Sequence, residues 1–354
     1  MSLLNYKCPS CGASITYDPN QDMGHCEFCG STFTLDELEK YNKEDQGEEK
    51  AVGQDGAQEK VQDDEEISGY TCENCGAEVV SDTTTSATFC YYCHSPVIIK
   101  RQLAGDFKPD YIVPFAIDKK KAQETFLSWA NKQTYVPRSF TEDSQLEKIT
   151  GVYLPYWFAD VKTNVNVSGV GTTTNVYTRG DTEYTEYMDY AVNANGDFDI
   201  KGIPELAFTQ IDRDLVKSVD DFSSAELRDF NMLYLSGFFS EKYDIDKEEV
   251  KSSFLKQAQS YAEDYVNSQF AQYDSVKRDV DQVDTNIEKI SYVLLPTWVL
   301  TYQYLDKNYV YMLNGLTGEA FGELPVDKTK LGIRSGLIFL VVMVLALLGG
   351  RFLW

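Results

Sequence analysis

The most uniformly apolar stretch of the chain is SGLIFLVVMVLALLGG, which runs from Ser335 to Gly350 and carries no charge. Its 16 residues would span about 24 Å as a helix, and apolar neighbours on both sides extend it toward the roughly 30 Å hydrocarbon core of a bilayer. A buried core helix is the alternative, but it fits less well with a run that is apolar on all faces. Residues 331–354 are therefore predicted to be a single transmembrane helix, a tail anchor in the lipid bilayer.

Residues 105–328 show the two periodicities of a mixed α+β domain. Every second residue from Val161 to Val167 is Val or Thr between polar neighbours, as expected of a half-buried strand. Asp118 and Asp246 each precede a helical pattern and are predicted N-caps, because a short carboxylate accepts hydrogen bonds from free N–H groups. Glu249 adds a capping-box partner in the second helix.

Four further local expectations follow from the pattern. The helix after Asp246 should run toward Asn267, and residues 273–290 should continue as a second polar helix. Gly169-Val170-Gly171 reads as a hairpin loop rather than a phosphate cradle. Asn314-Gly315 predicts a turn at the end of a strand.

The α+β domain also contains matching blocks. KITGVYLPYW, which ends at Trp157, resembles KISYVLLPTW, which ends at Trp298. Upstream, the Ile-Asp-Lys strings at Ile117 and Ile245 are followed by Phe-Leu at the same distance. Chance similarity is the alternative, but two matched blocks in the same order favour an internal duplication. The predicted repeats cover about residues 107–200 and 232–326.

An acidic segment separates the two cysteine-rich parts of the chain. Between Glu44 and Glu66 there are ten acidic and two basic residues, and apolar groups are few. Such a segment buries too little surface to offset its ordering entropy. Residues 41–69 are therefore predicted to be a disordered linker.

The eight cysteines form four C-x-x-C pairs, all before residue 94. Residues 1–40 and 70–101 hold two pairs each, with 14 residues between the inner cysteines and an offset of 64 between the copies. This spacing is typical of four-cysteine zinc ribbons. Each segment is predicted to be one ribbon that binds one structural Zn²⁺. The predicted ligands are Cys8, Cys11, Cys26 and Cys29 in ribbon 1, and Cys72, Cys75, Cys90 and Cys93 in ribbon 2.

The residues beside the cysteines support this chemistry. A glycine after the second cysteine of three pairs lets the backbone turn under a metal ion, and His94 takes that place in the fourth pair. His25 and His94 are alternative ligands, but four cysteines already close each site. Iron in a rubredoxin-like site and a redox dithiol are weaker alternatives, since the loop between the pairs is short and no thioredoxin-like pattern surrounds them.

The net charge and the lack of catalytic motifs argue against two classes of function, nucleic-acid binding and catalysis. The formal net charge of −24 disfavours nucleic acid, because phosphate binding needs clustered Lys and Arg. Phe28, Phe33, Tyr91 and Tyr92 offer an apolar docking face for a protein partner, or they pack around the metal knuckles. Both histidines lie in the ribbons, and no P-loop or dinucleotide fingerprint occurs. We therefore expect no enzyme activity, no catalytic residues and no cofactor besides zinc.

The flanking charges predict the orientation of the apolar segment. Lys328, Lys330 and Arg334 precede it, whereas Arg351 follows it. The positive-inside rule then places the N-terminal domains in the cytoplasm, on a single-pass protein of the cell membrane. Thiols that bind zinc also need a reducing compartment, which agrees with that side.

Together, these features resemble the TFIIB-type zinc-ribbon membrane proteins of Firmicutes and their relatives. The likeness rests on the paired ribbons, the linker, the Leu-Pro-x-Trp blocks, the apolar C-terminal segment, and NGLTGEAFGELP from Asn314 to Pro325. Members are encoded near SPFH (flotillin-like) and phage-shock-like proteins, which implies membrane recruitment or envelope stress. Some are catalogued as similar to primosomal helicase, although no ATPase motif occurs here. The resemblance carries over only the eight cysteines as functional residues.

The predicted fold is therefore two small β zinc ribbons, an internally duplicated α+β domain and one C-terminal transmembrane helix. The predicted function is a membrane-anchored, cytoplasm-facing adaptor that recruits or scaffolds a protein partner, with an SPFH-type protein as the suspected partner. The alternative is a nucleic-acid-binding zinc-ribbon protein tethered to the membrane.

Overall fold

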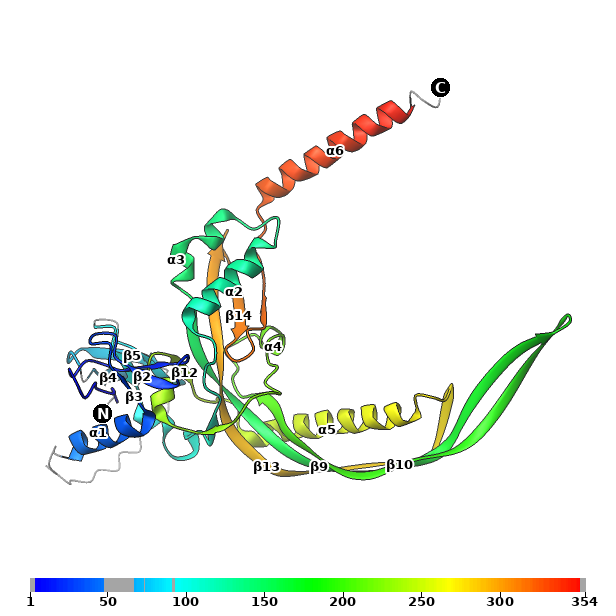
Figure 1. Ribbon diagram of the computed structural model, residues 1–354, viewed down its shortest axis with the longest axis horizontal. Coiled ribbons are helices and arrows are strands. Elements are labelled where there is room, and N and C mark those ends of the chain that lie inside the picture. Colours follow the sequence, from blue (N-terminus) through cyan, green and yellow to red (C-terminus); the bar gives the residue numbers. More distant parts are fainter. Residues whose placement is uncertain (1–3, 48–66, 73, 91–92, 351–354) are drawn as a thin grey trace.

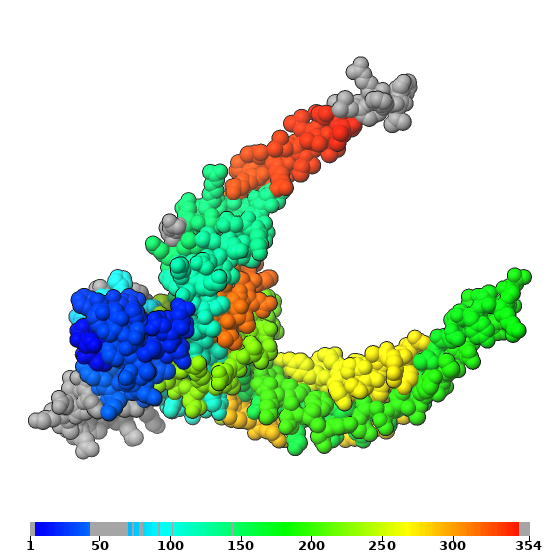
Figure 2. Space-filling view, in the orientation of Figure 1, coloured from blue at the N-terminus to red at the C-terminus, as the bar shows by residue number. Residues whose placement is uncertain are grey.

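The computed structural model describes residues 4–47, 67–72, 74–90 and 93–350. It consists of a cysteine-rich N-terminal part, a central body, a long curved arm and a C-terminal helix (Figure 1). Figure 2 shows the arm and the C-terminal helix standing away from the body. The body and the arm share one sheet, so the arm is an extension of the body's own strands.

The first cysteine-rich segment is a small antiparallel sheet followed by a helix. Its strands are β1 (Thr16–Asp18), β2 (Met23–His25) and β3 (Thr32–Phe33), and the helix is α1 (Leu35–Gly47). Thr34 and Glu37 form a capping box at the helix start, with the Glu37 carboxylate accepting from Thr34 N at 2.9 Å. The helix enters the segment predicted as a disordered linker, and residues 48–66 of that prediction lie outside the described residues.

The second cysteine-rich segment is built into the body. The hairpin of β4 (Ile67–Thr71) and β5 (Glu78–Asp82) is followed by β6 (Thr85–Phe89) and β7 (Pro96–Ile98). β4 therefore begins inside the range predicted as linker. β6 pairs with β12 (Phe239–Glu241) of the main sheet. Leu4 and Ile98 exchange backbone hydrogen bonds of 2.8 and 3.0 Å, which join the two cysteine-rich segments directly.

The main sheet has ten strands, of which β9 and β13 form the centre. Its path runs β11-β8-β13-β9-β12-β6-β7, while β10 pairs with β9, β14 with β13, and β15 with β14. The strands not yet bounded are β8 (Tyr111–Ile112), β9 (Thr150–Arg179), β10 (Thr182–Leu206), β11 (Arg228–Asp229), β13 (Ser275–Tyr304), β14 (Lys307–Asn314) and β15 (Ala320–Gly322).

The helices cover this sheet and connect its strands. The α-helices are α2 (Lys119–Asn131), α3 (Asp143–Leu146), α4 (Arg213–Lys217), α5 (Lys247–Phe270) and α6 (Lys328–Gly350). Short 3₁₀ helices are η1 (Lys100–Leu103), η2 (Gly105–Phe107), η3 (Arg138–Thr141) and η4 (Met232–Leu235). Asp118 caps α2 by accepting from Lys121 N at 2.7 Å, and Asp246 caps α5 with the expected Glu249 capping box.

The arm is formed by the outer parts of β9, β10 and β13, with α5 packed on its concave face (Figure 1). Buried Val165 and Val192 of the strands meet Ala262 and Val266 of the helix. The prediction of a second helix over residues 273–290 is wrong, because this segment is strand β13. Alternating Val, Thr and Ile side chains are partly buried there, as period-two packing requires.

The prediction of a hairpin loop at Gly169-Val170-Gly171 is also wrong, because all three residues lie inside β9. The opposite strand has a bulge between Arg278 and Val280, which brings the two backbones close together. A Cβ at Gly169 would collide with the Lys277 carbonyl oxygen, so only glycine fits. The hairpin turns instead at Gly180 and Asp181, whereas the turn predicted after Asn314 is present.

The two Leu-Pro-x-Trp segments occupy equivalent places at the centre of the body. They pair antiparallel with Leu154 opposite Leu295. The Trp157 indole N–H donates to the Ile245 carbonyl at 2.8 Å, and the Trp298 indole N–H donates to the Ile117 carbonyl at 2.9 Å. Each tryptophan therefore holds the loop before the capped helix that precedes the other Leu-Pro-x-Trp segment.

Candidate metal centres and membrane segment

The fold gathers the eight predicted cysteine ligands into two groups of four. Within each group all the sulfur atoms lie within 4.8 Å of one another. One group is Cys8, Cys11, Cys26 and Cys29, and the other is Cys72, Cys75, Cys90 and Cys93. Among the described residues no histidine or carboxylate belongs to either group. Two tetracysteine groups of this kind can hold two zinc ions.

The sulfur spacing matches the size of a zinc–tetrathiolate. Four sulfurs at about 2.3 Å from a tetrahedral ion lie about 3.8 Å apart. In the first group the Cys8–Cys29 and Cys11–Cys26 sulfurs are each 3.6 Å apart. In the second group the corresponding separations are 3.8 and 3.7 Å. The thiols therefore fit the ion without a change in backbone position.

The backbone of each C-x-x-C pair forms a tight turn that aims both sulfurs at one point. The N–H of Gly12 donates to the Cys8 carbonyl at 2.8 Å, with φ of +75° at the glycine. Gly30 and Gly76 repeat this bond and this left-handed conformation. His94 does the same with φ of +56°, donating its N–H to the Cys90 carbonyl at 2.9 Å. His94 thus acts through its backbone, in the position that glycine occupies elsewhere.

Hydroxyl groups next to the sulfurs favour the thiolate form that binds metal. Hydrogen bonding by the Ser31 hydroxyl, 3.2 Å from the Cys29 sulfur, lowers the pKa of that thiol to about 6. Burial alone would raise the pKa of Cys93, but its hydrogen bonds with Ser95 and Asn74 outweigh burial and lower the pKa to about 6. Metal binding releases fewer protons from such thiols at neutral pH.

Sequence reasoning missed Ser31 and Ser95 as part of these centres. Both follow the last cysteine of their group by two residues, so they obey the same offset of 64 as the cysteines. The extended pattern C-x-x-C-x-S was therefore present in both copies. Asn74, in contrast, has no counterpart of the same type in the first copy, where Ser10 occupies the place.

Both cysteine-rich segments contact the body through packed and hydrogen-bonded side chains. Tyr17 of β1 packs edge-on against Tyr234 with ring centroids 5.1 Å apart. Arg228 forms an ion pair with Asp22. In the second segment the hydroxyls of Ser86 and Ser240 lie 2.9 Å apart in a buried contact between β6 and β12. The two cysteine-rich segments are therefore docked on the body rather than separate from it.

The predicted membrane segment forms helix α6, which is long and apolar enough to cross a bilayer. The apolar side chains from Leu337 to Leu345 are each at least 41% exposed, so the body buries none of them. The helix base is fixed to the body, because Lys330 Nζ donates to the Val136 carbonyl at 2.7 Å and Arg334 lies 5.6 Å from the Tyr135 ring centre.

The fold and these sites define a protein with two tetracysteine centres on a mixed α/β body that carries one apolar C-terminal helix. No protein-family model matches the chain, and no solved structure matches it. The chain is 30% identical over 355 residues to a Bacillus subtilis (strain 168) protein named Uncharacterized protein YdjG, with 99% of this chain and 100% of that protein covered. The chain therefore belongs to the YdjG family.

Proposed function

We propose that this chain is a membrane-anchored adaptor whose zinc ribbons face the cytoplasm and recruit a protein partner. The observation that carries the proposal is Phe28, whose side chain is 83% exposed between Cys26 and Cys29. A large aromatic group exposed on a C-x-x-C turn contributes nothing to the core, and it suits a partner's apolar pocket. Phe33 is partly buried, and Tyr91 and Tyr92 lie outside the described residues.

Two features support the reading of the N-terminal segments as structural zinc ribbons. Each has four cysteines, which leave a tetrahedral ion no open position for catalysis. The first segment also has short strands around its knuckles, and small segments of this kind depend on a metal for stability. The proposed ions are therefore structural, and they hold Phe28 in its exposed position.

The equivalent contacts of the two Leu-Pro-x-Trp segments support an internal duplication of the body. β12 runs parallel to β9 with Phe239 opposite Val152. β8 runs parallel to β13 with Tyr111 opposite Val293, the position that corresponds to Val152. Pairings that repeat in this way are expected if two copies of one unit face each other. The copies then differ in the long hairpin of β9 and β10 and in the capped helix, which has 13 residues in α2 and 24 in α5.

A protein partner suits the charge of the chain better than nucleic acid does. The net charge is −24, and α1 beside the first metal centre has acidic residues in its first turn and no basic ones in its last. The family resemblance suggests an SPFH-type partner at the membrane. The apolar helix α6 would keep the ribbons near such a partner, which raises their effective concentration.

The proposal is tested by crosslinking the full-length protein in membranes and purifying it in detergent. The variants are Phe28→Ser and, as a matched control, Leu305→Ser, because Leu305 is 69% exposed on the β13–β14 turn. We expect wild type and the control to recover the same SPFH-type partner, and Phe28→Ser to lose at least about tenfold. Equal recovery with Phe28→Ser, or no protein partner, contradicts the proposal. A salt-sensitive complex with RNA or DNA would instead support the rival function.

A further inference from the structure

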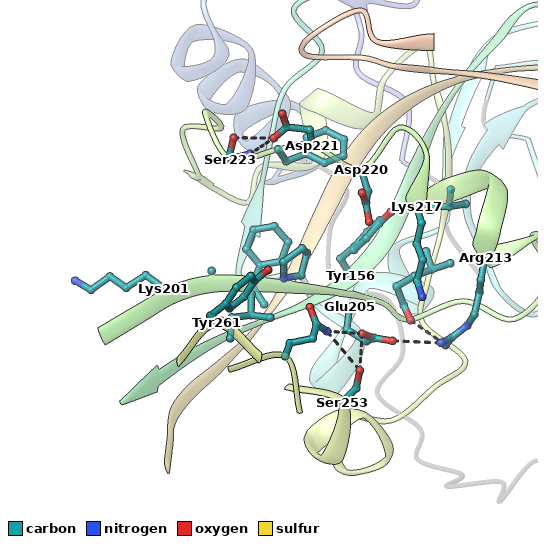
Figure 3. A pocket seen from close by; sticks show the side chains of 18 residues that line it. Tyr156, Lys201, Glu205, Arg213, Lys217, Asp220, Asp221, Ser223, Ser253 and Tyr261 are labelled. Atoms are coloured by element: carbon teal, nitrogen blue, oxygen red, sulfur yellow. Dashed lines mark hydrogen bonds and ion pairs between the residues drawn. The ribbon is translucent and has the colours of Figure 1, made fainter. Parts of the chain in front are cut away.

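A cavity of about 740 Å³ lies where the arm joins the body. Strands β9 and β10, helix α4 with the loop after it, and helix α5 surround it (Figure 3). Its apolar wall consists of Phe158, Ile203, Leu206, Val216 and Phe222. The volume falls in the range of sites that hold small organic molecules.

A β-bulge shapes one side of this cavity. The register of β10 shifts between Ile200 and Ile203, and Gly202 adopts a left-handed φ of +66°. Asp160 fixes the bulge by accepting a hydrogen bond of 3.0 Å from Gly202 N. A bulge of this kind redirects side chains away from the regular strand pattern, and bulges are common beside functional sites.

Some of the polar groups in the cavity are already satisfied. The Glu205 carboxylate accepts from Ser253 Oγ at 2.8 Å, from Gln257 Nε2 at 2.9 Å and from Arg213 Nη1 at 3.2 Å. Asp221 accepts from the Ser223 hydroxyl at 2.6 Å. The carboxylates of Glu205 and Asp221 therefore need no ligand, whereas the Arg213 guanidinium has N–H donors beyond this bond.

Other polar groups in the cavity make no hydrogen bond or ion pair with another side chain in the described part of the chain. Tyr156 is only 2% exposed, and its hydroxyl makes no hydrogen bond there. Figure 3 shows Tyr156 and Asp220 pointing toward one another, with Lys217 between this pair and Arg213. Neither Asp220 nor Lys217 forms an ion pair within the described residues. Burial raises the pKa of the Asp220 carboxyl, although the positive charge of Lys217 acts in the opposite direction.

We propose that this cavity binds a small zwitterion of the α-amino acid class. The ligand's ammonium group would lie against the Asp220 carboxylate and the Tyr156 oxygen, and its carboxylate would lie against Lys217 and Arg213. A simple anion would meet Asp220, and a simple cation would meet Lys217 and Arg213, so each leaves one charge unmatched. An apolar ligand would cover the Tyr156 hydroxyl and the Asp220 carboxylate without forming hydrogen bonds to them, which costs free energy.

This proposal does not depend on the adaptor function. The cavity is separate from both metal centres, and it is lined by α5 of the arm and by the loop after α4 of the body. Asn314 fixes that loop, because its side-chain amide donates to the carbonyls of Val219 at 2.8 Å and Asp221 at 3.0 Å. The binding site is therefore largely pre-formed.

Titration calorimetry on the full-length protein in detergent micelles tests the proposal. The probes are the twenty protein amino acids, with n-butylamine and butyrate as compounds that carry only one of the two charges. We expect saturable binding of at least one amino acid, and binding of both single-charge compounds that is at least about tenfold weaker. If none of the twenty amino acids binds saturably, or if either single-charge compound binds equally well, the proposal is overturned.

Two variants tie the binding to the cavity. Tyr156→Phe removes only the unpaired hydroxyl, and Asp220→Asn removes only the charge. Each should weaken binding at least about tenfold, while Tyr156→Phe should leave the thermal midpoint of the free protein unchanged or higher. Tyr187→Phe and Asp279→Asn make the same chemical changes on the arm, outside the cavity, and should not affect binding. Unchanged binding in Tyr156→Phe places the ligand elsewhere and refutes the assignment.

Discussion

His94 has a role in the structure that its residue type does not suggest. Its type suggests a metal ligand, yet the structure uses its left-handed backbone at the place where three other knuckles have glycine. Histidine tolerates this conformation better than most residues, whereas β-branched residues tolerate it poorly. The grouping of the cysteines was predictable because a tetrahedral ion requires such a spacing, but the role of His94 depends on φ, which residue type alone does not reveal.

Substitution of His94 separates these two roles. His94→Gly should keep two zinc ions per chain, because glycine adopts the same φ at no cost. His94→Val should weaken the second centre, since a β-branched residue is strained by about 1–2 kcal/mol or more in this conformation. Zinc content by mass spectrometry and the rate of zinc loss to a chelator measure both effects. Loss of one zinc from His94→Gly would show instead that the imidazole is a ligand.

Glu241 is expected to make stability depend on pH. It lies on β12 where the second cysteine-rich segment joins the body, and its Oε2 is buried with no hydrogen-bond partner among the described residues. Burial, with smaller contributions from Asp82 and Asp244, raises its pKa to about 7, against the hydrogen bonds from Thr84 and Thr85. Folding therefore favours the protonated form of Glu241 more than the unfolded chain does.

The pKa of Glu241 is higher in the folded state than in the unfolded state. The stabilisation that results is fully present below about pH 4.5 and is lost as the pH rises through about 7. Glu241→Gln has no charge to bury, so it should be more stable than wild type at pH 8, by roughly 2 kcal/mol. The two proteins should converge near pH 5. Thermal midpoints across this range measure the difference. A difference that does not vary with pH would contradict the assignment of this titration to Glu241.

At the scale of elements, the capped helices and the Leu-Pro-x-Trp strands were predictable, whereas the arm was not. Asp118 and Asp246 signal their helices through local chemistry that does not depend on the rest of the fold. Residues 273–290 are polar because β13 is solvent-exposed on one face, and this polarity resembled an exposed helix. Their partly buried Val and Ile side chains pack near helix α5, and their backbone pairs with β9, which is distant in sequence, so tertiary contacts decide their conformation.

The arm itself depends on the close approach of β9 and β13 at Gly169. Gly169→Ala should destabilise it by about 1–3 kcal/mol, because the new Cβ meets the backbone carbonyl of Lys277 and the bulge must move. Gly196→Ala on the neighbouring strand β10 is the matched control, since nothing lies within 4 Å of its Cβ position. Hydrogen exchange of β9 and β13 should be faster only in Gly169→Ala. Equal exchange in both variants would show that the bulge tolerates a side chain.

At the scale of the whole molecule, the position of the second metal centre could not be predicted from sequence. Its strand β6 pairs with β12, and the Ser86–Ser240 contact joins residues 154 positions apart. Strand pairs so far apart in sequence leave no periodic signal in either segment. The duplicated cysteine spacing suggested two equivalent modules, whereas the body incorporates the second one as part of its own sheet.

Attachment to a membrane is expected to depend on the centre of α6 and not on its ends. Two arginines in Leu340→Arg, Val344→Arg would sit at the middle of the apolar run, where each costs about 2.5–3.5 kcal/mol. This variant should move from the membrane fraction to the soluble fraction, yet retain both zinc ions, because α6 packs on neither metal centre. Leu331→Arg, Ile333→Arg adds the same charge at the helix start, where the side chains can reach the headgroups, and should stay in the membrane. If both double variants remain membrane-bound after alkaline extraction, α6 is not the anchor.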